Sequence, residues 1–370
     1  MTQRHNHAPV GVLLMNTGTP ASPDPADIRP YLAEFLSDRR LIDLPRFLWL
    51  PILHGIILRT RPKKTSPHYA RIWTPEGSPF LLDSLAQRHG LQCQLDLATD
   101  GQPHRYVVEL AMRYGQPSLT NALDALESAG CQRVICMPLF PQAAFATTGS
   151  CQDVLTQQAA ARPDLELDVV TSYGAHSLWR QALANSIKHA WTPTPGSKLL
   201  FAFHSIPVSN VEAGDTYPHQ VNRDTAAVAE LLGLGPDDWA IGFQSRFDSR
   251  KWLQPTPEKT LAKWAAEGVR NVAVVAPGFA TDCLETLREC AQDQRDLFLR
   301  ACAEADASCA VADVANAQST DDATSAVAGT DDAGDAESSS SPGASFVYVP
   351  CLGACPSHLE CLARVVLEQG

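Results

Sequence analysis

The chain has 370 residues, of which 45% are hydrophobic, and its formal net charge at pH 7 is −12. This length and composition are typical of a globular protein with one large domain or two of ordinary size. The charge is uneven, because residues 303–345 hold nine acidic and no basic side chains, while the rest of the chain has a net charge of −3. The sequence has no basic stripe, so we expect no nucleic-acid partner.

The N-terminal residues, MTQRHNHAPVGVLLMN, contain no charged segment followed by an apolar one, so no secretory signal is predicted. Eleven cysteines are spread through strand-like and helix-like segments, unlike the framework of a small secreted protein. We therefore expect a cytoplasmic protein whose thiols are free or bound to metal.

Short apolar segments alternate with helix-like ones along almost the whole chain, which predicts βα units around parallel sheets. The expected strands are residues 10–16, 106–114, 133–140, 165–170, 198–203, 239–244, 271–277 and 346–350. Eight strands are more than one small domain needs. We therefore predict two α/β lobes, comprising residues 1–150 and 151–355, with the boundary near residue 150.

Residues 44–64, LPRFLWLPILHGIILRTRPKK, form the most apolar stretch, but its uninterrupted apolar pieces are too short to span a bilayer. Its C-terminal end is basic, with Arg59, Arg61, Lys63 and Lys64. One interpretation is a buried helix with a solvated end. The other is an apolar lip with a cationic rim, suited to an apolar anionic ligand or to a membrane surface.

Residues 305–345 are rich in Ala, Ser, Asp and Thr and contain no aromatic residue. Such a segment buries too little apolar surface to offset the entropy of ordering it. We expect a disordered insertion before the last strand, with an Ala-rich helix as the alternative.

Candidate catalytic groups follow two of the predicted strands. His204 comes directly after the strand 198–203, and Asp282, Glu285 and Glu289 follow the strand 271–277 with helical spacing. Ligands of α/β proteins bind beyond the carboxyl ends of the strands. An imidazole opposite carboxylates suits metal binding or proton abstraction, whereas a lone histidine with a structural role is the alternative.

Two further features leave alternatives open. The spacing Cys351-x3-Cys355-x5-Cys361 is not a standard zinc motif, so these thiols are also compatible with ordinary buried residues. Trp252, in SRFDSRKWLQPT, is either a core residue or a wall for a flat ligand.

The chain resembles the ferrochelatase family over nearly its whole length apart from residues 305–345. The resemblance is carried, in chain order, by LLMNTGTP, YLAEFLSDRRLIDLP, RIWTPEGSPF, AMRYGQPSL, MPLFPQ, FHSIP, GDTYPHQV, FQSRFDSRKWLQPTP, PGFATDCLETL and YVPCL. It implies two similar Rossmann-like lobes with a porphyrin cleft between them, and a C-terminal helix, residues 356–370, packing across both lobes.

The resemblance implies a lyase that inserts Fe²⁺, as substrate, into protoporphyrin IX to give protohaem, the last step of haem biosynthesis. The segment GIILRTRPKK is most similar to the enzymes of Gram-negative bacteria, which favours protoporphyrin IX over coproporphyrin III. Insertion into coproporphyrin III, and non-catalytic binding of porphyrin or haem, are the alternatives. We expect a monomer that contacts the cytoplasmic face of the inner membrane peripherally.

The resemblance assigns His204 to metal binding and proton abstraction, Glu285 to the position facing it across the porphyrin, and Glu289 to a metal route. The remaining residues that it assigns to the porphyrin cleft are Thr17, Arg61, Ser78, Arg113, Tyr114, Trp252 and Phe279.

The chain departs from the family pattern at several points. Thr17 stands where leucine or tyrosine is usual, Asp248 replaces a glycine, and the acidic insertion is foreign to the pattern. Some relatives hold a [2Fe–2S] cluster with four cysteines. The tail motif of the animal enzymes is absent here, but Cys151, Cys351, Cys355 and Cys361 would supply the four thiolates that such a cluster needs.

Overall fold

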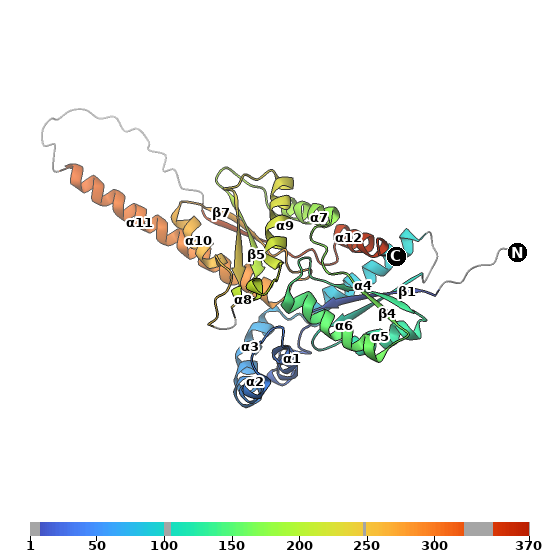
Figure 1. Cartoon of the computed structure of the whole chain (residues 1–370). Helices are drawn as coiled ribbons and strands as arrows, with labels where there is room; N and C mark the ends of the chain where they lie inside the picture. The colour runs from blue at the N-terminus through green and yellow to red at the C-terminus, as the bar shows by residue number, and fades with distance from the viewer. Residues whose placement is uncertain (1–7, 100–104, 247–248, 322–342, 370) are drawn as a thin grey trace.

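The structure is a computed structural model that describes residues 8–99, 105–246, 249–321 and 343–369. Its described part contains two four-stranded sheets, each built only from parallel strands. The two sheets belong to two lobes that follow each other along the chain (Figure 1). The predicted α/β class and its parallel sheets are therefore confirmed.

The first sheet has the strand order β2-β1-β3-β4. Its strands are β1 (Val10–Asn16), β2 (Tyr106–Met112), β3 (Arg133–Pro138) and β4 (Glu166–Val169). Alternate residues of β1 pack into different core clusters, Val12 and Leu14 in one and Leu13 and Met15 in the other. This explains the continuous apolar run, because a central parallel strand is covered on both faces.

The second sheet repeats this arrangement with the order β6-β5-β7-β8. Its strands are β5 (Lys198–His204), β6 (Trp239–Gln244), β7 (Asn271–Val275) and β8 (Ser345–Val349). In β5, Phe201 and Phe203 pack on one face and Leu200 and Ala202 on the other. In each lobe the two central strands are parallel, so their carboxyl ends lie at the same edge of the sheet. His204 is at this edge in the second lobe, because it is the last residue of β5.

Helices connect the strands in both lobes. In the first lobe they are α4 (Pro79–Ala98), α5 (Leu119–Ser128), α6 (Ser150–Ala161) and the π-helix η2 (Phe145–Gly149). In the second lobe they are α7 (Ser177–Ala190), α8 (Val208–Glu212), α9 (Tyr217–Leu232), α10 (Pro257–Ala266), the π-helix η3 (Glu285–Gln294) and α11 (Arg295–Asp321).

The first sheet extends beyond the predicted boundary near residue 150. Strand β4 pairs with β3, with Arg133 opposite Glu166 and Cys136 opposite Val169. The chain passes to the second sheet only after this strand. Residues 141–149, which directly precede the predicted boundary, belong to the loop and π-helix after β3.

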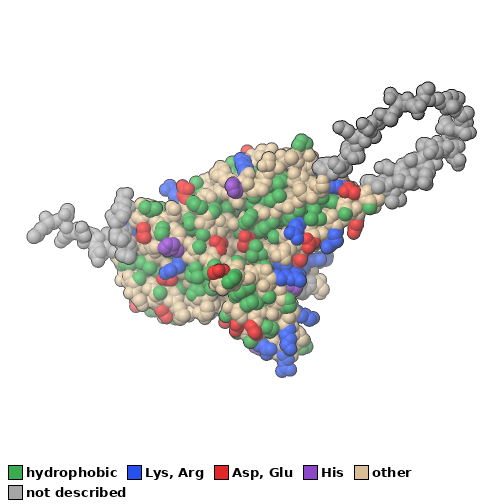
Figure 2. Space-filling view, turned by 180° about the vertical axis from the view of Figure 1, so that it is seen from behind, with side chains coloured by type: hydrophobic (Ala, Val, Ile, Leu, Met, Phe, Trp, Pro, Cys, Tyr) green, Lys and Arg blue, Asp and Glu red, His purple; other side chains and the backbone are tan. Residues whose placement is uncertain are grey.

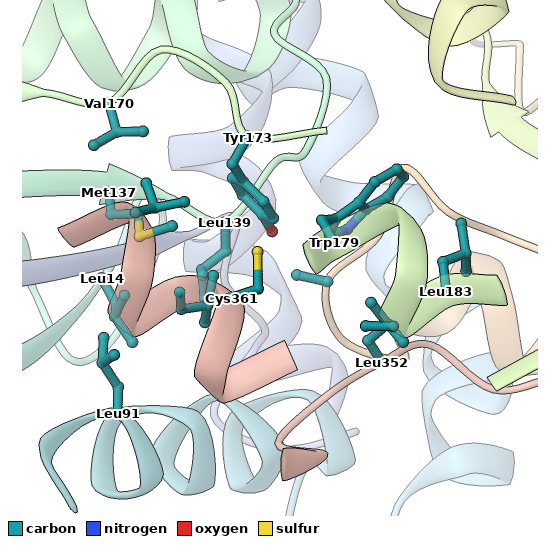
Figure 3. Packing of buried hydrophobic residues seen from close by; sticks show 14 of the residues in the cluster. Leu14, Leu91, Met137, Leu139, Val170, Tyr173, Trp179, Leu183, Leu352 and Cys361 are labelled. Atoms are coloured by element: carbon teal, nitrogen blue, oxygen red, sulfur yellow. The ribbon is translucent and has the colours of Figure 1, made fainter. Parts of the chain in front are cut away.

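The last helix, α12 (Pro356–Leu367), packs against α4 of the first lobe and α7 of the second. Figure 3 shows this region, where Cys361 of α12 lies among Leu91 of α4, Trp179 of α7 and Leu139. The apolar core is thus continuous between the lobes, and α12 ties their helices together.

Residues 44–64 belong to a helical layer outside the first sheet, at the bottom of Figure 1. This layer consists of α1 (Pro25–Ser37), α2 (Arg46–Ile52), the π-helix η1 (Leu53–Ile57) and α3 (Leu58–Ile72). Trp49, Leu53 and Leu58 are buried, whereas Phe47 and Ile56 are 76% and 61% exposed. Each of the two interpretations of 44–64 therefore describes one of its faces.

No helix in the described ranges is long and apolar enough to cross a membrane.

The predicted disorder of residues 305–345 is wrong for residues 305–321, where α11 continues to Asp321. Phe298 and Cys302 bury the start of this helix in the core, and Arg270 forms an ion pair with Asp306 at 2.5 Å. Extending an anchored helix through alanine-rich sequence costs far less than nucleating one. Residues 322–342 lie outside the described part of the chain.

Candidate active site

A cleft opens where the two lobes meet the helices α1 and α3. Its walls come from the end of β1, the loop after β3, the loops after β5 and β7, and the two helices. Ten residues of the sequence-based predictions line it: Thr17, Arg61, Ser78, Arg113, Tyr114, Cys151, His204, Trp252, Phe279 and Glu285. Glu289, Cys351, Cys355 and Cys361 are not among its lining residues.

His204 is the last residue of β5, and its ring lies at the cleft. Nδ1 donates a hydrogen bond to the carbonyl of Ser205 at 2.7 Å, because a carbonyl oxygen can only accept. In the neutral ring the basic lone pair is then on Nε2. Burial lowers the pKa of His204, although the Ser205 carbonyl and Glu285 act against that shift. The imidazole is therefore neutral and able to accept a proton at pH 7.

Glu285 begins the π-helix η3 and lines the same cleft. Its charge acts on His204 from one side and on Tyr31 and Tyr69 of the helical layer from another. Burial is the main cause that raises the pKa of both tyrosine hydroxyls, and the negative charge of Glu285 adds to it. The structure thus brings the predicted histidine and glutamate together at the cleft. It also places two tyrosine hydroxyls, those of Tyr31 and Tyr69, within reach of the charge of the glutamate.

The helix that carries the acidic residues is a π-helix over ten residues rather than an α-helix. Its i→i+5 hydrogen bonds widen each turn, so residues four apart lie nearly above one another. Glu285, Glu289 and Asp293 therefore follow one line along η3. Buried Gln244, at the end of β6, anchors this helix, since its Nε2 donates to the carbonyl of Glu285 and its Oε1 accepts from Cys290.

Asp282 does not belong to this acidic line, contrary to the prediction. It precedes η3, and its Oδ1 accepts hydrogen bonds from Tyr348 Oη at 2.6 Å and Thr286 Oγ1 at 2.8 Å. Asp282 therefore joins the start of the π-helix to β8, and the third acidic residue of the line is Asp293.

Glu289 lies one turn beyond Glu285, in a pocket outside the cleft. Ser245 Oγ donates a hydrogen bond to Glu289 Oε2 at 2.6 Å. Burial, followed by the negative charge of Glu285, raises the pKa of Glu289 to about 7. A carboxyl with this pKa exchanges a proton for a cation readily at neutral pH.

Two aromatic side chains form walls of the cleft. Trp252 is 6% exposed and pairs through its backbone with Pro207, just after the His204 loop begins. Phe279 follows β7 and packs against two core clusters. Trp252 is thus both a buried residue and a wall of the cleft, so each of the two alternatives left by the sequence describes part of its surroundings.

The predicted polar residues of the porphyrin cleft differ in their surroundings. Burial lowers the pKa of Arg61, so its charge is poorly solvated and suited to an anionic ligand. Ser78 Oγ lies 3.0 Å from Thr19 Oγ1. Arg113 instead pairs with buried Asp38 at 2.6 Å, and Tyr114 Oη donates to the same carboxylate at 2.7 Å. The positive charge of Arg113 is therefore already compensated by Asp38 within the protein.

Sequence reasoning missed several residues of the cleft. Tyr31 and Tyr69 line the cleft, and Asp38 pairs with the cleft residue Arg113, but no role was predicted for any of the three. The segment YLAEFLSDRRLIDLP contains Tyr31 and Asp38, but only the contacts between the helical layer and the lobes show their roles.

The structure does not bring the four proposed cluster cysteines together. Cys151 lies in α6 beside Cys136, Cys351 is near Tyr348, and Cys361 is near His176. Burial raises the pKa of Cys151 and Cys361 to about 12, which opposes thiolate formation. Among the described residues, no three His, Cys, Asp or Glu side chains form a group that could hold a metal ion. The prediction of a [2Fe–2S] cluster on these residues does not fit the structure.

Two parallel α/β lobes enclosing a cleft with an imidazole, a carboxylate, aromatic walls and arginines define a metal-handling enzyme of the chelatase type. A model of the ferrochelatase family matches residues 9–318. The chain belongs to the ferrochelatase family, the lyases that insert iron into protoporphyrin in haem biosynthesis.

Individual relatives agree with this assignment. The chain is 38% identical to a ferrochelatase from Xanthomonas axonopodis pv. citri over 96% of both chains. It is 45% identical to one from Bordetella pertussis over 97% of this chain and 88% of the other. Among solved structures, it is similar to the sirohydrochlorin chelatase SirB from Bacillus subtilis subspecies spizizenii in complex with cobalt, with a TM-score of 0.46, 12% identity and coverage of 97% and 94%.

Proposed function

We propose that the porphyrin is protoporphyrin IX, held in the cleft between His204 and Glu285. The observation that carries this proposal is the interaction of these two side chains at a cleft walled by Trp252 and Phe279. Aromatic walls suit a flat macrocycle, and half-buried Arg61 suits a propionate.

In this proposal His204 is the base. Its neutral ring accepts pyrrole protons at Nε2 while the hydrogen bond from Nδ1 to Ser205 keeps the ring in one orientation. Glu285 receives Fe²⁺ on the cleft side, because carboxylate oxygens are ligands for ferrous iron. His204 Nε2 accepts one pyrrole proton at a time and releases it to solvent before it accepts the second. Once both protons have left the cleft, the arrival of the divalent cation leaves the net charge of the porphyrin unchanged.

Glu289 and Asp293 extend this carboxylate line to the outer pocket. The iron substrate would enter there and pass to Glu285, exchanging water for carboxylate oxygens at each step. Each handover covers one turn of the π-helix, which is a consequence of its wider turn.

The substrate proposal is tested by anaerobic incubation of the purified protein with Fe²⁺ and either protoporphyrin IX or coproporphyrin III. We expect loss of porphyrin fluorescence at a kcat/KM at least about tenfold higher with protoporphyrin IX, because two further carboxylates would have to be desolvated for coproporphyrin III. A preference for coproporphyrin III would refute the substrate proposal. Porphyrin binding without iron insertion would indicate the non-catalytic alternative.

We also propose that the outer face of the helical layer binds the cytoplasmic face of a membrane peripherally. Its exposed apolar residues are Leu44, Phe47, Leu48, Ile52 and Ile56. Exposed Arg59, Lys63 and Lys64 follow on α3, and Figure 2 shows basic side chains at the lower end of this projection. Apolar area beside basic charge is the pattern of an interfacial anchor.

Flotation with anionic liposomes tests the membrane proposal. We expect binding at low salt that weakens at high salt, since each Lys or Arg near the surface contributes about 1 kcal/mol. The double variant Phe47→Ser, Ile56→Ser should lose most of this binding. The matched control Leu97→Ser, Leu231→Ser removes exposed leucines elsewhere and should float like the unchanged protein. Equal flotation of all three proteins would contradict the proposal.

A further inference from the structure

The outer pocket beside η3 contains positive as well as negative charge. Its acidic residues are Glu258, Glu289, Asp293 and Asp296, and its basic residues are Arg288 and Arg300. Glu289 is the acidic residue of this pocket nearest along the helix to Glu285 of the cleft. A cation on its way to the cleft therefore meets arginine charge as well as the carboxylates.

Arg288 lies beside the acidic line and pairs with one of its members. Its Nη2 forms an ion pair with Asp293 Oδ2 at 3.2 Å, and its charge also acts on Glu289, where it lowers the carboxyl pKa against the dominant effect of burial. The pair is partly open to solvent, because the Arg288 side chain is 27% exposed and Asp293 is 51% exposed. A pair this exposed is weak, so a divalent ion can displace it.

The Arg288 side chain, on η3, also lies near helix α3. His68 of α3 lies close enough for Arg288 to lower its pKa, although burial is the larger cause. Arg288 Nε and His68 Nδ1 are both buried, and neither has a hydrogen-bond partner within the described part of the chain. The guanidinium thus has an unsatisfied donor and is not locked into a complete network.

We propose that Arg288 is a gate residue that sets how strongly the outer end of the η3 carboxylate line takes up divalent cations. Paired with Asp293, it neutralises that carboxylate and repels a cation approaching Glu289. A divalent ion has to displace the guanidinium from Asp293 before both carboxylates can bind it. Arg288 is a positioning residue here, because it acts through Asp293 and Glu289 and does not contact porphyrin in the cleft.

The gate concerns two of the three aligned carboxylates, Glu289 and Asp293. No group of three potential ligands that could hold a metal is present in the described ranges, although Glu285, Glu289 and Asp293 follow one line. With Arg288 paired to Asp293, the outermost carboxylate is withheld until a cation competes for it. This inference rests on the proposed entry of iron past Glu289.

The test measures binding of Co²⁺ alone to the full-length, porphyrin-free protein by calorimetry at pH 8. That pH lies above the pKa of about 7 of Glu289 in the unchanged protein, so its carboxyl is mostly ionised there. Arg288→Gln should lower the Kd about three- to tenfold, because one positive charge a few ångströms from a divalent ion is removed. Arg300→Gln removes the same charge from the same pocket without touching the Arg288–Asp293 pair, and should change the Kd less than about twofold.

The variants separate failure of the gate from failure of the route. An unchanged or weaker Kd in Arg288→Gln, or an equal change in Arg300→Gln, would overturn the gate. Glu289→Gln should weaken Co²⁺ binding in the same experiment. If it does so while Arg288→Gln has no effect, the route holds and the gate is wrong; if neither variant changes the Kd, the entry route itself is wrong. Protoporphyrin binding and Tm, measured on each variant, identify any that is misfolded.

Discussion

Replacing His204 with alanine is expected to abolish iron insertion while porphyrin binding is retained. The substitution removes the Nε2 lone pair beside Glu285 but leaves Trp252 and Phe279 in the cleft walls. Loss of a positioned general base costs about 10²–10⁴-fold in rate, and His204 is proposed to serve as metal ligand too, so we expect a fall in kcat of about 10³-fold or more.

This prediction is measured by anaerobic fluorescence assays of insertion and by quenching of intrinsic fluorescence on porphyrin binding. His89→Ala is the control, since His89 is an exposed histidine on α4 outside the cleft. Activity of His204→Ala within tenfold of the unchanged protein would show that another group takes the pyrrole protons. The Tm of the variant should fall only slightly, because the ring lies at the cleft and its hydrogen bond to the Ser205 carbonyl joins neighbouring residues.

Replacing Glu285 with glutamine is expected to lower kcat by about 10²–10³-fold with little effect on folding. The amide keeps the size of the side chain but removes the charge next to His204, and loss of one preorganised electrostatic group has an effect of this size. Glu289→Gln, one turn further from the porphyrin, should instead raise the apparent KM for Fe²⁺ and change kcat much less. Steady-state kinetics over a range of Fe²⁺ concentrations separate the two effects.

The pH dependence of stability provides an independent check on Glu289. Its pKa is raised from 4.5 to about 7 in the folded chain, so the folded state binds this proton more tightly than the unfolded state. The folded protein then loses stability as the pH rises from 4.5 through 7. Metal-free Glu289→Gln lacks this loss and should gain Tm relative to the unchanged protein at pH 8, but not at pH 4.5. A lower Tm for the variant at pH 8 would indicate that Glu289 has a structural role.

Much of the fold follows from local sequence patterns. The apolar runs predict all eight strands to within a few residues at either end, because a strand covered on both faces needs continuous apolar sequence. His204 and Glu285 could be found in the same way, since a parallel sheet places the carboxyl ends of neighbouring strands at one edge. The family resemblance added their roles, which strand patterns alone leave open.

Other features depend on contacts between distant segments. The spacing of Asp282, Glu285 and Glu289 is compatible with an α-helix, but Gln244 anchors a π-helix here, and Tyr348 draws Asp282 away from the acidic line. Backbone hydrogen-bond register is decided by what packs against a helix, and the local sequence did not reveal it.

The remaining predictions also divide into those that rest on local sequence and those that depend on contacts between distant residues. By itself, the sequence determined the two α/β lobes, the acidic composition after residue 303 and the pairing of apolar and basic residues in 44–64. Only the tertiary structure decided that β4 belongs to the first sheet, that Asp38 neutralises Arg113 and that the four cysteines lie apart. Strands and amphipathic faces are encoded by neighbouring residues. Ion pairs, strand order and metal-ligand sets require residues far apart in the chain to meet, and that depends on how the whole core packs.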